Sequence, residues 1–396
     1  MPDNVLNAIS YDSSRLADYT TYDDTADRGS VDLPFALLTL LLLTVGVIMV
    51  LSASFARAYY DPTNDTGGNA TYYFVRQALF AMCGVGVMFV CSRFPMGFYR
   101  HISSIVLLVS LGLLVLVLVP GIGEKANNAR RWINLGFTTF QPSEIAKIGV
   151  IMQFSVLICR FKDKMSNPKY GIIPFGIILG AMCFLLYLEP HMSAIIIILA
   201  IGMVMLFLGG LPLYWFIGGG VAGASLLGIG YAVFPYVRDR FSAWLNPFAD
   251  MSGDGYQIVQ SLYSIGSGGL LGLGLGNSRQ KYLYLPEEHN DFIFSIVCEE
   301  LGYIGAMLIL ILFALLIIRG YWLAMHARDR YSALVGAGIV THLAMQVILN
   351  VAVCTNSIPC TGISLPFFSY GGTALLLQMA EIGIVLSLSR DIPEKR

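Results

Sequence analysis

The sequence predicts an all-α polytopic membrane protein with about ten transmembrane helices. Three observations predict this class. Of the 396 residues, 56% are hydrophobic and only 12% are charged, whereas a soluble domain carries about a quarter charged residues. The apolar residues form long runs, and about 20 of them in one helix cross a bilayer. These runs are continuous rather than alternating, which argues against a transmembrane β-barrel.

In chain order, the predicted membrane helices are residues 33–56, 77–92, 102–119, 144–159, 171–188, 192–208, 213–234, 292–318, 332–353 and 373–389. In hydrocarbon every backbone N–H and C=O needs an internal partner, and continuous helices supply it. We therefore expect one membrane domain at residues 33–390. It includes a large external loop at 235–290, between the seventh and eighth helices.

The two ends of the chain are predicted to be tails. Residues 1–32 are acidic, rich in Tyr, Ser and Thr, and lack the basic start and cleavage site of a signal peptide. We expect a disordered cytoplasmic tail there and a short cytoplasmic tail at 391–396. Lys and Arg gather in cytoplasmic loops, and a cytoplasmic N-terminus puts most basic loop residues on that side, with exceptions in the longer outside loops. Both termini are therefore predicted to be cytoplasmic.

Charge and cysteine usage narrow the function classes. The net charge of −1 argues against nucleic acid as a partner, because no strongly basic surface is available. The seven cysteines include no CxxC motif and no metal-ligand spacing, so no metal site is predicted from them. Cys354 and Cys360 share a predicted outside loop. They either form a disulfide or are two free, small apolar residues.

Five acidic residues gather in LYLPEEHNDFIFSIVCEELG, at 283–302. Asp291 lies at the outer end of the eighth predicted helix, where the helix dipole favours an anion. Either Asn290 or Asp291 is a simple N-cap, or the Asp291 carboxylate has a chemical role. Glu299 and Glu300 fall inside the helix, where a carboxylate is costly and usually faces a partner or a cavity. We expect them to be structural polar residues in a polar outer half of the bundle.

A second charged stretch, ARRWINLGFTTFQPSEIAKIG at 129–149, places Arg130 and Arg131 outside and then begins the fourth helix. Glu144 and Lys147 are three residues apart, so they share one helical face. They form either a local ion pair that lowers the cost of both charges or part of a charged cavity that also contains Asp291.

Two further segments have unusual composition. GDGYQIVQSLYSIGSGGLLGLGLGNSRQK, at 253–281, contains alternating glycines, but no GK[ST] follows and no strand precedes them, so a phosphate-binding loop is rejected. We expect a partly interfacial loop with an amphipathic start at 256–263. CTGISLPFFSYGGTALLLQ, at 360–378, contains Ser369 and places Pro366 and two glycines before the last helix. Irregular backbone at that depth lines a cavity or is buried in protein.

ARRWI…QPSEIAK, LPEEHNDFIFSIVCEELG and TGISLPFFSYGGT occur in this order at these places among the ten helices. With them, the chain resembles the SEDS (shape, elongation, division and sporulation) family of bacterial cell-wall polymerases over nearly everything after the tail. VLSAS at 50–54 and SRQKYLYLPEEHNDFIF are most similar to the division member or its sporulation relative. One departure is His191, which follows LEP where the family often has Asp.

The resemblance implies an inverting peptidoglycan glycosyltransferase that polymerises lipid II into β-1,4 glycan strands at the outer face of the bacterial cytoplasmic membrane during cell division. Asp291 matches the family's essential Asp and would accept the proton of the acceptor hydroxyl. The charge growing on the pyrophosphate leaving group needs a cation. The expected substrate-binding or cavity residues are Arg130, Arg131, Glu144, Lys147, Arg238, Arg240, Lys281 and Ser369. No soluble cofactor is implied, and a divalent cation, Mg²⁺ or Mn²⁺, is the alternative counter-charge.

The implied partners are lipid II, undecaprenyl-pyrophosphate-linked glycan, a class B penicillin-binding protein that cross-links the new strands, and other division-complex membrane proteins. Two alternatives belong to other classes. A lipid II flippase or transporter would use Glu299, Glu300 and Glu381 as relay groups. A scaffold that recruits a transpeptidase would not need the charge of Asp291.

Overall fold

The computed structural model describes residues 28–392 except 61–65, 127, 128, 137, 234, 252 and 254, and these residues are mostly helical. The helices are α3 (Leu33–Tyr59), α4 (Tyr72–Cys91), α5 (Met96–Leu118), α6 (Pro142–Arg160), α7 (Pro168–Gly171), α8 (Ile173–Leu188), α9 (Met192–Leu208), α10 (Leu213–Val233), α11 (Pro235–Leu245), α12 (Tyr256–Ser267), α13 (Ile293–Met325), α14 (Arg330–Cys354) and α15 (Gly372–Ser389), with the short 3₁₀ helices η1 (Lys162–Lys164) and η2 (Pro247–Asp250). Nine of the ten predicted runs each coincide with one helix, although some of these helices extend several residues beyond the run, and the run 171–188 covers the end of α7 and all of α8. The predicted fold class is therefore confirmed.

Eight helical stretches in the described part of the chain are long and apolar enough to cross a membrane. They are α3, α4, α5, α6, the α7–α8 stretch, α13, α14 and α15. The apolar helix α9 has only 17 residues, which is near the lower limit of a membrane-spanning helix. The count of ten spans therefore stays a prediction, whereas the multi-pass character of the protein does not depend on it.

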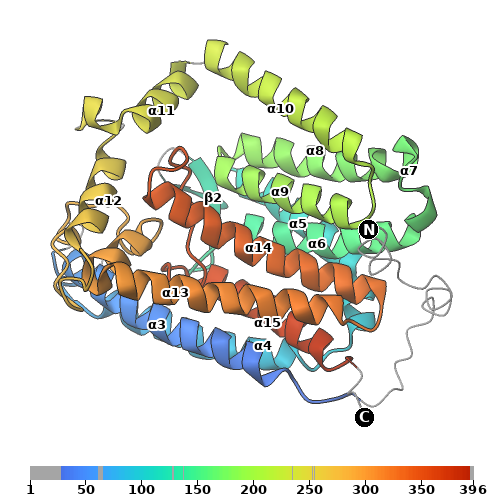
Figure 1. The fold of residues 1–396 in the computed structure, drawn as a ribbon, viewed down its shortest axis with the longest axis horizontal. Coiled ribbons are helices and arrows are strands. Elements are labelled where there is room, and N and C mark those ends of the chain that lie inside the picture. The colour runs from blue at the N-terminus through green and yellow to red at the C-terminus, as the bar shows by residue number, and fades with distance from the viewer. Residues whose placement is uncertain are drawn as a thin grey trace, which may run out of the picture.

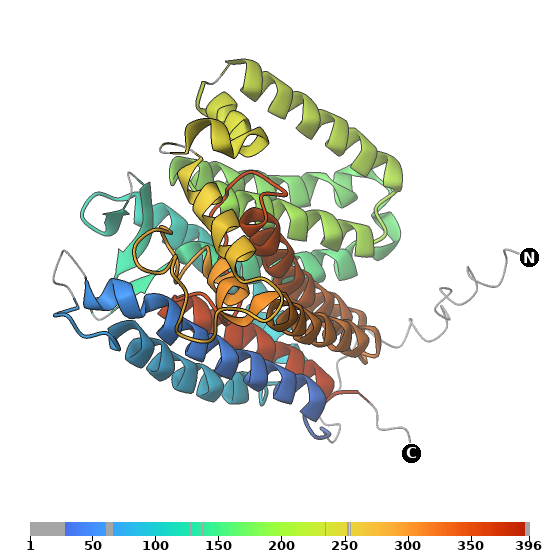
Figure 2. The same cartoon turned by 60° about the vertical axis from the view of Figure 1, so that its left-hand side comes forward.

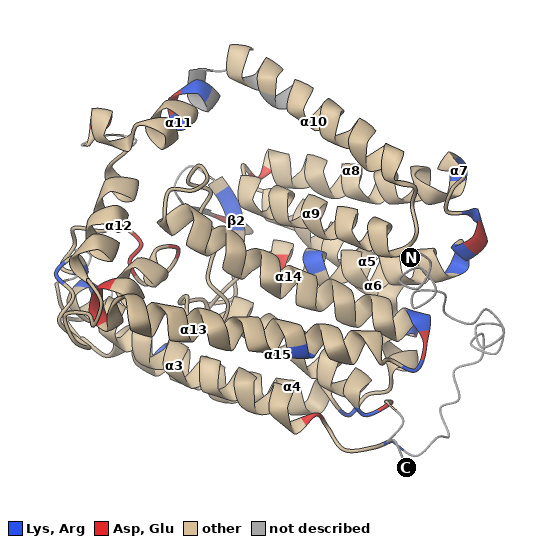
Figure 3. Ribbon diagram, in the orientation of Figure 1, with Lys and Arg blue, Asp and Glu red and all other residues tan. Residues whose placement is uncertain are grey.

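The helices pack side by side into one bundle, with α10 held apart from it beside α11 (Figures 1 and 2). α15 packs on α4, α13 packs on α3 and α14, and α6 packs on α5 and α9. Their shared apolar core runs from Phe35 on α3 to Leu388 on α15. Figure 3 shows that Lys, Arg, Asp and Glu are concentrated near the ends of the helices and in the connections, which is the pattern that a bilayer imposes on a bundle.

The last residues of the predicted N-terminal tail are tied to the bundle. Asp32 caps α3 by accepting a hydrogen bond from the backbone of Phe35 at 2.9 Å and pairs with Arg319 of α13. Arg28 pairs with Asp391 at 2.8 Å, which brings the two ends of the membrane domain together. The rest of the predicted tail, residues 1–27, and most of the predicted C-terminal tail lie outside the described residues.

A small antiparallel sheet in the connection between α5 and α6 was not expected from the sequence. It contains β1 (Gly123–Ala126), β2 (Ala129–Asn134) and β3 (Thr139–Phe140), in the order β1-β2-β3. Glu124 pairs with Trp132, and Ile133 pairs with Phe140. The sheet holds the basic ARRW segment as a strand rather than a loose loop.

Helix α13 is broken at Gly302, whose φ of 68° and ψ of −173° are not helical. The loop that follows α12 inserts its backbone at the break. Leu273 and Gly274 donate hydrogen bonds to the carbonyl groups of Glu299 and Glu300 at 2.9 and 3.0 Å. A Cβ atom on Gly302 would lie 2.2 Å from the backbone nitrogen of Gly272, so only glycine permits this approach. The break gives α13 a short first segment that follows Asp291.

Candidate active site

A cavity of about 790 Å³ lies among α4, β2, α6, α9, α14 and the two irregular segments that precede α13 and α15. It brings together five of the residues that the sequence singled out, which are Arg131, Glu144, Lys147, Asp291 and Ser369. These residues span more than half of the chain in sequence. The cavity therefore joins the three motifs that the sequence analysis identified separately.

The turn that presents Asp291 is fixed by the segment before α15. Ser369 donates a hydrogen bond from its hydroxyl to the carbonyl of Asn290 at 2.7 Å and accepts one from the backbone of Leu365 at 2.7 Å. The backbone N–H of Tyr370 donates to the carbonyl of His289 at 2.9 Å. From α14, Asn350 donates its side-chain amide to the carbonyl of Asp291 itself at 2.8 Å. The backbone on both sides of Asp291 is thus held in place while its carboxylate lines the cavity.

The interpretation of Asn290 or Asp291 as an N-cap is wrong. Helix α13 begins at Ile293, and its N-cap position is Phe292, which has no side-chain capping bond. Asn290 instead donates to the carboxylate of Glu287 at 2.6 Å. Because Asp291 lies one residue before the cap position, its carboxylate is not required to begin the helix.

The surroundings of Asp291 suit a base. Burial and the nearby Glu287 carboxylate, opposed by the Arg131 guanidinium, together raise the pKa of Asp291 to about 6. A carboxylate whose pKa lies close to neutral pH is ionised in the cell and still accepts a proton readily. A Cβ atom added at Gly362 would lie 3.0 Å from Oδ2 of Asp291, so the carboxylate is packed close to the 360–378 segment.

Glu144 and Lys147 form a buried ion pair on the first two turns of α6. Their charged atoms are 2.7 Å apart, and the side chains are 10% and 2% exposed. The sequence offered a local ion pair or a charged cavity as alternatives. The structure has both, because the two charges pair with each other and also line the cavity with Asp291. Removing one partner of such a pair leaves a charge without compensation, at a cost of about 3–5 kcal/mol.

The rim of the cavity near Arg131 contains the position at which the chain departs from the family pattern. The Arg131 guanidinium donates to the carbonyl groups of Glu189 and Pro190, between α8 and α9. Burial raises the pKa of the Glu189 carboxyl to about 8, opposed by Arg131. Burial and Arg131 lower the pKa of His191 to about 3. His191, which contacts Gln141 at 3.3 Å, is therefore neutral at physiological pH and cannot replace a carboxylate as an anion.

Four residues expected in the cavity are not among its lining residues in the described part of the chain. Arg130 donates to the carbonyl of Leu118, and Arg238 and Arg240, on α11, donate to backbone carbonyl groups. Lys281 is buried, and its ammonium lies 2.9 Å from Glu300. The prediction failed for Lys281 because its counter-charge lies in α13, which spacing in the sequence does not reveal.

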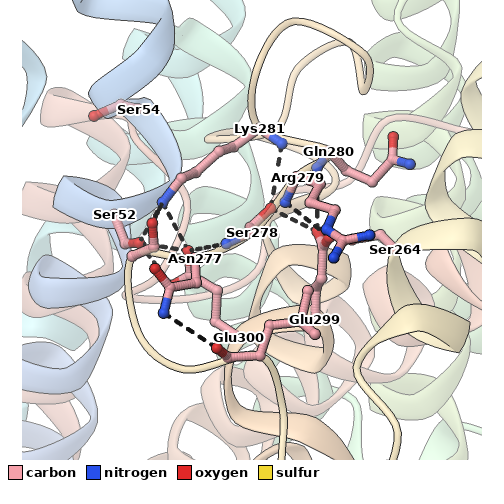
Figure 4. A network of polar contacts seen from close by, with 12 residues as sticks. Ser52, Ser54, Ser264, Asn277, Ser278, Arg279, Gln280, Lys281, Glu299 and Glu300 are labelled. Carbon is pink, nitrogen blue, oxygen red and sulfur yellow. Dashed lines mark hydrogen bonds and ion pairs between the residues drawn. The ribbon is translucent and has the colours of Figure 1, made fainter.

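The expectation of a structural role for Glu299 and Glu300 agrees with a buried polar network around Lys281 (Figure 4). Glu299 accepts hydrogen bonds from the hydroxyls of Ser264 and Ser278 at 3.0 and 2.5 Å and from backbone N–H groups of the same loop. Glu300 accepts from the hydroxyl of Ser52 on α3. The two carboxylates thus fasten the loop after α12 to the first segment of α13.

Comparison with known proteins decides the family. The family model shared by FtsW, RodA and SpoVE, described as a cell cycle protein, matches residues 33–393. The chain belongs to this SEDS family. Stage V sporulation protein E of Bacillus subtilis (strain 168) is 40% identical over 92% of this chain and 99% of its own length. A probable peptidoglycan glycosyltransferase FtsW of Coxiella burnetii (strain RSA 493 / Nine Mile phase I) is 38% identical over 91% and 97%.

Solved structures of the SEDS family share the fold. A chain from a peptidoglycan synthase complex, described for its structural coordination of polymerization and crosslinking, matches with a TM-score of 0.77 and 27% identity over 92% of this chain and 99% of that chain. The rod shape determining protein RodA of Thermus thermophilus matches with a TM-score of 0.64 and 26% identity over 92% and 98%. The helical bundle described above is therefore a SEDS fold.

Several lining residues of this SEDS cavity escaped sequence reasoning. Tyr73 and Arg76 of α4 and Gln346 of α14 all line it. Glu287 lines it too, although the sequence showed it only as one of five clustered acidic residues. Gln346 was detectable in principle, since it and Asn350 are four residues apart on one helical face within an apolar run. Arg76 could not be assigned to the cavity from the sequence, because nothing in its own segment shows which elements approach it.

The cysteines and the candidate metal ligands complete the description of the site. Cys354 and Cys360 are both free thiols, so of the two alternatives the structure has the unpaired one. Within the described residues, no group of three or more His, Cys, Asp or Glu side chains is arranged to hold a metal ion. A divalent cation in this cavity would need oxygen ligands from a substrate in addition to the protein carboxylates.

Proposed function

We propose that this protein is an inverting peptidoglycan glycosyltransferase, which polymerises lipid II into β-1,4 glycan strands at the outer face of the bacterial cytoplasmic membrane during cell division. The observation that carries the proposal is the position of Asp291, a carboxylate of raised pKa in a cavity that also contains Arg131 and Lys147. The relatives named probable peptidoglycan glycosyltransferase FtsW support the reaction class. The relative named for sporulation leaves the division role as the finer part of the proposal.

In the proposed reaction Asp291 acts as the general base. The 4-hydroxyl oxygen of the acceptor GlcNAc attacks the anomeric carbon of the lipid-linked donor chain. As the new C–O bond forms, the bond from the anomeric carbon to the pyrophosphate oxygen breaks, and its electron pair leaves with the pyrophosphate. The hydroxyl proton passes to Asp291. A single displacement at an α-linked donor inverts the configuration and gives a β-1,4 bond.

The leaving group requires positive charge. Arg131 and Lys147 line the same cavity as the base and suit an anion that gains charge as the bond breaks. Glu144 holds the Lys147 ammonium at 2.7 Å, which fixes its position in the cavity. A divalent cation, Mg²⁺ or Mn²⁺, is proposed as an alternative counter-charge; it would bind through the substrate phosphates and one or two cavity carboxylates.

A class B penicillin-binding protein is the proposed partner enzyme, and other division-complex membrane proteins are proposed to join it. Support comes from the related chain in a peptidoglycan synthase complex described for polymerization and crosslinking. A transpeptidase beside the polymerase would receive the glycan strand as it leaves the cavity.

The transporter alternative gains no support from the break in α13. Discontinuous helices of transporters expose unwound backbone to a substrate or ion. Here the carbonyl groups of Glu299 and Glu300 are occupied by the protein's own loop. Glu381 is paired with His342 at 3.0 Å. The groups that a relay would use are thus engaged in structural contacts.

The decisive experiment is lipid II polymerisation by the purified protein, alone and with its partner enzyme. Glycan strands made by the wild type and not by Asp291→Asn would support the proposal. Recruitment of the partner without any strand synthesis would favour the scaffold, and lipid II translocation without synthesis would favour the flippase. Orientation has its own test: we expect an impermeant thiol reagent to label Tyr284→Cys, and not Lys164→Cys, in intact cells. Labelling at Lys164→Cys would reverse the topology.

A further inference from the structure

One wall of the cavity is aromatic, and it has no role in the reaction proposed above. Tyr73 of α4, His289 of the Asp291 turn and Tyr370 of the segment before α15 pack against one another. The ring centroids are 4.8 Å apart for Tyr73 and His289 and 5.0 Å apart for Tyr73 and Tyr370, the latter pair edge to face at 84°. The ring centroids of Tyr72 and Tyr73 are 5.3 Å apart. The Arg76 guanidinium lies over the Tyr72 ring, 4.6 Å from its centroid. The tyrosine wall is defined here as Tyr72, Tyr73 and Tyr370.

The backbone beneath the tyrosine wall is held rigidly. Gln77, one turn after Tyr73 on α4, is fully buried. Its amide nitrogen donates to the carbonyl of Ser369 at 3.2 Å, and its amide oxygen accepts from the backbone of Gly371 at 3.4 Å. The Tyr370 N–H donates to the carbonyl of His289. The backbone is therefore held by hydrogen bonds at Ser369, Tyr370 and Gly371. This fixes the position of Tyr370 before any ligand binds, which lowers the entropic cost of binding.

The chemistry of this wall matches a sugar better than a phosphate. All three tyrosines are half-buried and line the cavity, so they present apolar surface beside polar edges. A β-linked pyranose carries its polar groups at the ring edge and C–H groups on its two faces. Those C–H faces complement the negative face of an aromatic ring. Arg76 adds a donor at the margin for hydroxyl, amide or phosphate oxygens.

The position of the wall decides which sugar it serves. The wall is joined through His289 and Tyr370 to the turn that carries Asp291, two residues further along. A general base must lie within hydrogen-bond reach of the hydroxyl whose proton it takes, and that hydroxyl belongs to the acceptor. The cationic side of the cavity, with Arg131 and Lys147, suits the pyrophosphate of the donor instead.

We infer that Tyr72, Tyr73 and Tyr370 form the acceptor subsite, which binds the β-1,4-linked N-acetylhexosamine disaccharide of the incoming lipid II by stacking. This inference rests on the proposed glycosyltransferase function and adds to it a division of the cavity into an aromatic acceptor side and a cationic donor side.

The experiment separates acceptor from donor. Lipid II whose GlcNAc 4-hydroxyl is capped by galactose can act only as a donor. The capped donor is held at saturation, and the initial rate of its joining is measured against the concentration of uncapped lipid II, with purified protein in nanodiscs. Tyr73→Leu and Tyr370→Leu, which remove a ring, are expected to raise the half-saturating acceptor concentration about tenfold. Tyr73→Phe, which keeps the ring, is expected to stay within about twofold of the wild type.

Phe89→Leu is the matched control, because it removes a ring from α4 at an exposed position, 46% accessible, outside the cavity lining. It should leave both substrate dependences unchanged. The same measurement with varied capped donor should show no change for the tyrosine variants.

The inference is overturned if both ring-removing variants that fold, as judged by their unfolding temperature, keep the wild-type dependence on acceptor. An equal effect on donor and acceptor would also overturn it, because the wall would then support the whole cavity. A wild-type protein that joins no lipid II would instead refute the proposed function itself.

Discussion

Replacing Asp291 with asparagine separates a catalytic carboxylate from a structural one, because the two effects of the change have opposite signs. Asparagine keeps the size of the side chain but cannot accept the hydroxyl proton. General-base catalysis contributes about 10²–10⁴-fold to a rate, so we expect Asp291→Asn to lose a factor of about a hundred or more in polymerisation. The turn should persist, since Ser369 and Asn350 bind the backbone around Asp291 rather than its carboxylate.

The stability of the same variant should rise. Burial raises the pKa of Asp291 from its ordinary 3.8 to about 6, so ionisation is less favourable in the folded protein than in the unfolded chain. A difference of about two pKa units corresponds to about 3 kcal/mol of destabilisation above pH 6. The carboxylate lines a cavity that water can enter, which reduces this figure to about 1–2 kcal/mol. Below pH 3.8 both states are protonated and the penalty disappears. The gain from asparagine should therefore grow from about pH 4 to pH 6 and stay constant above it.

Two measurements on one preparation test this reasoning. Polymerisation is followed with purified lipid II, and thermal unfolding is followed in nanodiscs between pH 4 and pH 8. Asn290→Ala is the control, because it removes a neighbouring polar side chain without removing the proposed base. Near-normal glycan synthesis by Asp291→Asn would remove this carboxylate as the base. A variant that is inactive and also less stable at neutral pH would mean that the carboxylate supports the structure.

The remaining predictions concern the residues around this carboxylate and the break in α13. Because burial raises the pKa of Asp291 to about 6, kcat/KM of the wild type should fall as pH drops through about 6; a flat profile between pH 5 and 8 would exclude this group. Lys147→Ala should lower polymerisation at least tenfold at a normal membrane level, since it leaves its partner buried and unpaired; normal synthesis would reduce the pair to a local contact. Ser369→Ala removes two hydrogen bonds of 2.7 Å from the turn and should lower kcat about tenfold. An unchanged kcat would mean that the turn keeps its conformation without these two bonds. Gly302→Ala meets backbone at 2.2 Å with φ at 68° and should greatly reduce the folded protein in membranes, whereas Gly266→Ala, with no heavy atom within 4 Å, should accumulate normally; equal levels of the two would contradict the account of the break.

The helices were predictable because the bilayer imposes one simple requirement on the sequence. A run such as 192–208 must be apolar throughout, and its predicted bounds equal those of α9. The motifs around Asp291 and Glu144 were also visible, since charge next to an apolar run is costly enough to need a reason. That both groups line one cavity required the packing of α6 against α14, which no local pattern encodes.

The failures have a common physical cause, which is pairing between distant segments. Gly302 in an apolar run is indistinguishable from an ordinary helical glycine until Gly272 is placed against it. Lys281 was taken as a cation for the leaving group, whereas its ammonium is neutralised by Glu300 and also donates a hydrogen bond to Ser52. The strands β1–β3 are too short and too polar to give a periodic signal.

The break at Gly302 also determines how much of α13 has to enter lipid when the chain is first inserted. Residues 303–325 keep 23 of the 33 residues of α13 and measure about 34 Å as a helix, enough to cross about 30 Å of hydrocarbon. The translocation machinery can therefore release this stretch into the bilayer and leave Glu299 and Glu300 on the aqueous side. Their contacts with the loop after α12 then form on the aqueous side, so neither carboxylate has to cross the hydrocarbon core. A chain with leucine at both positions would have a longer apolar stretch, so the first segment of α13 would enter the lipid and draw Asp291 out of the cavity.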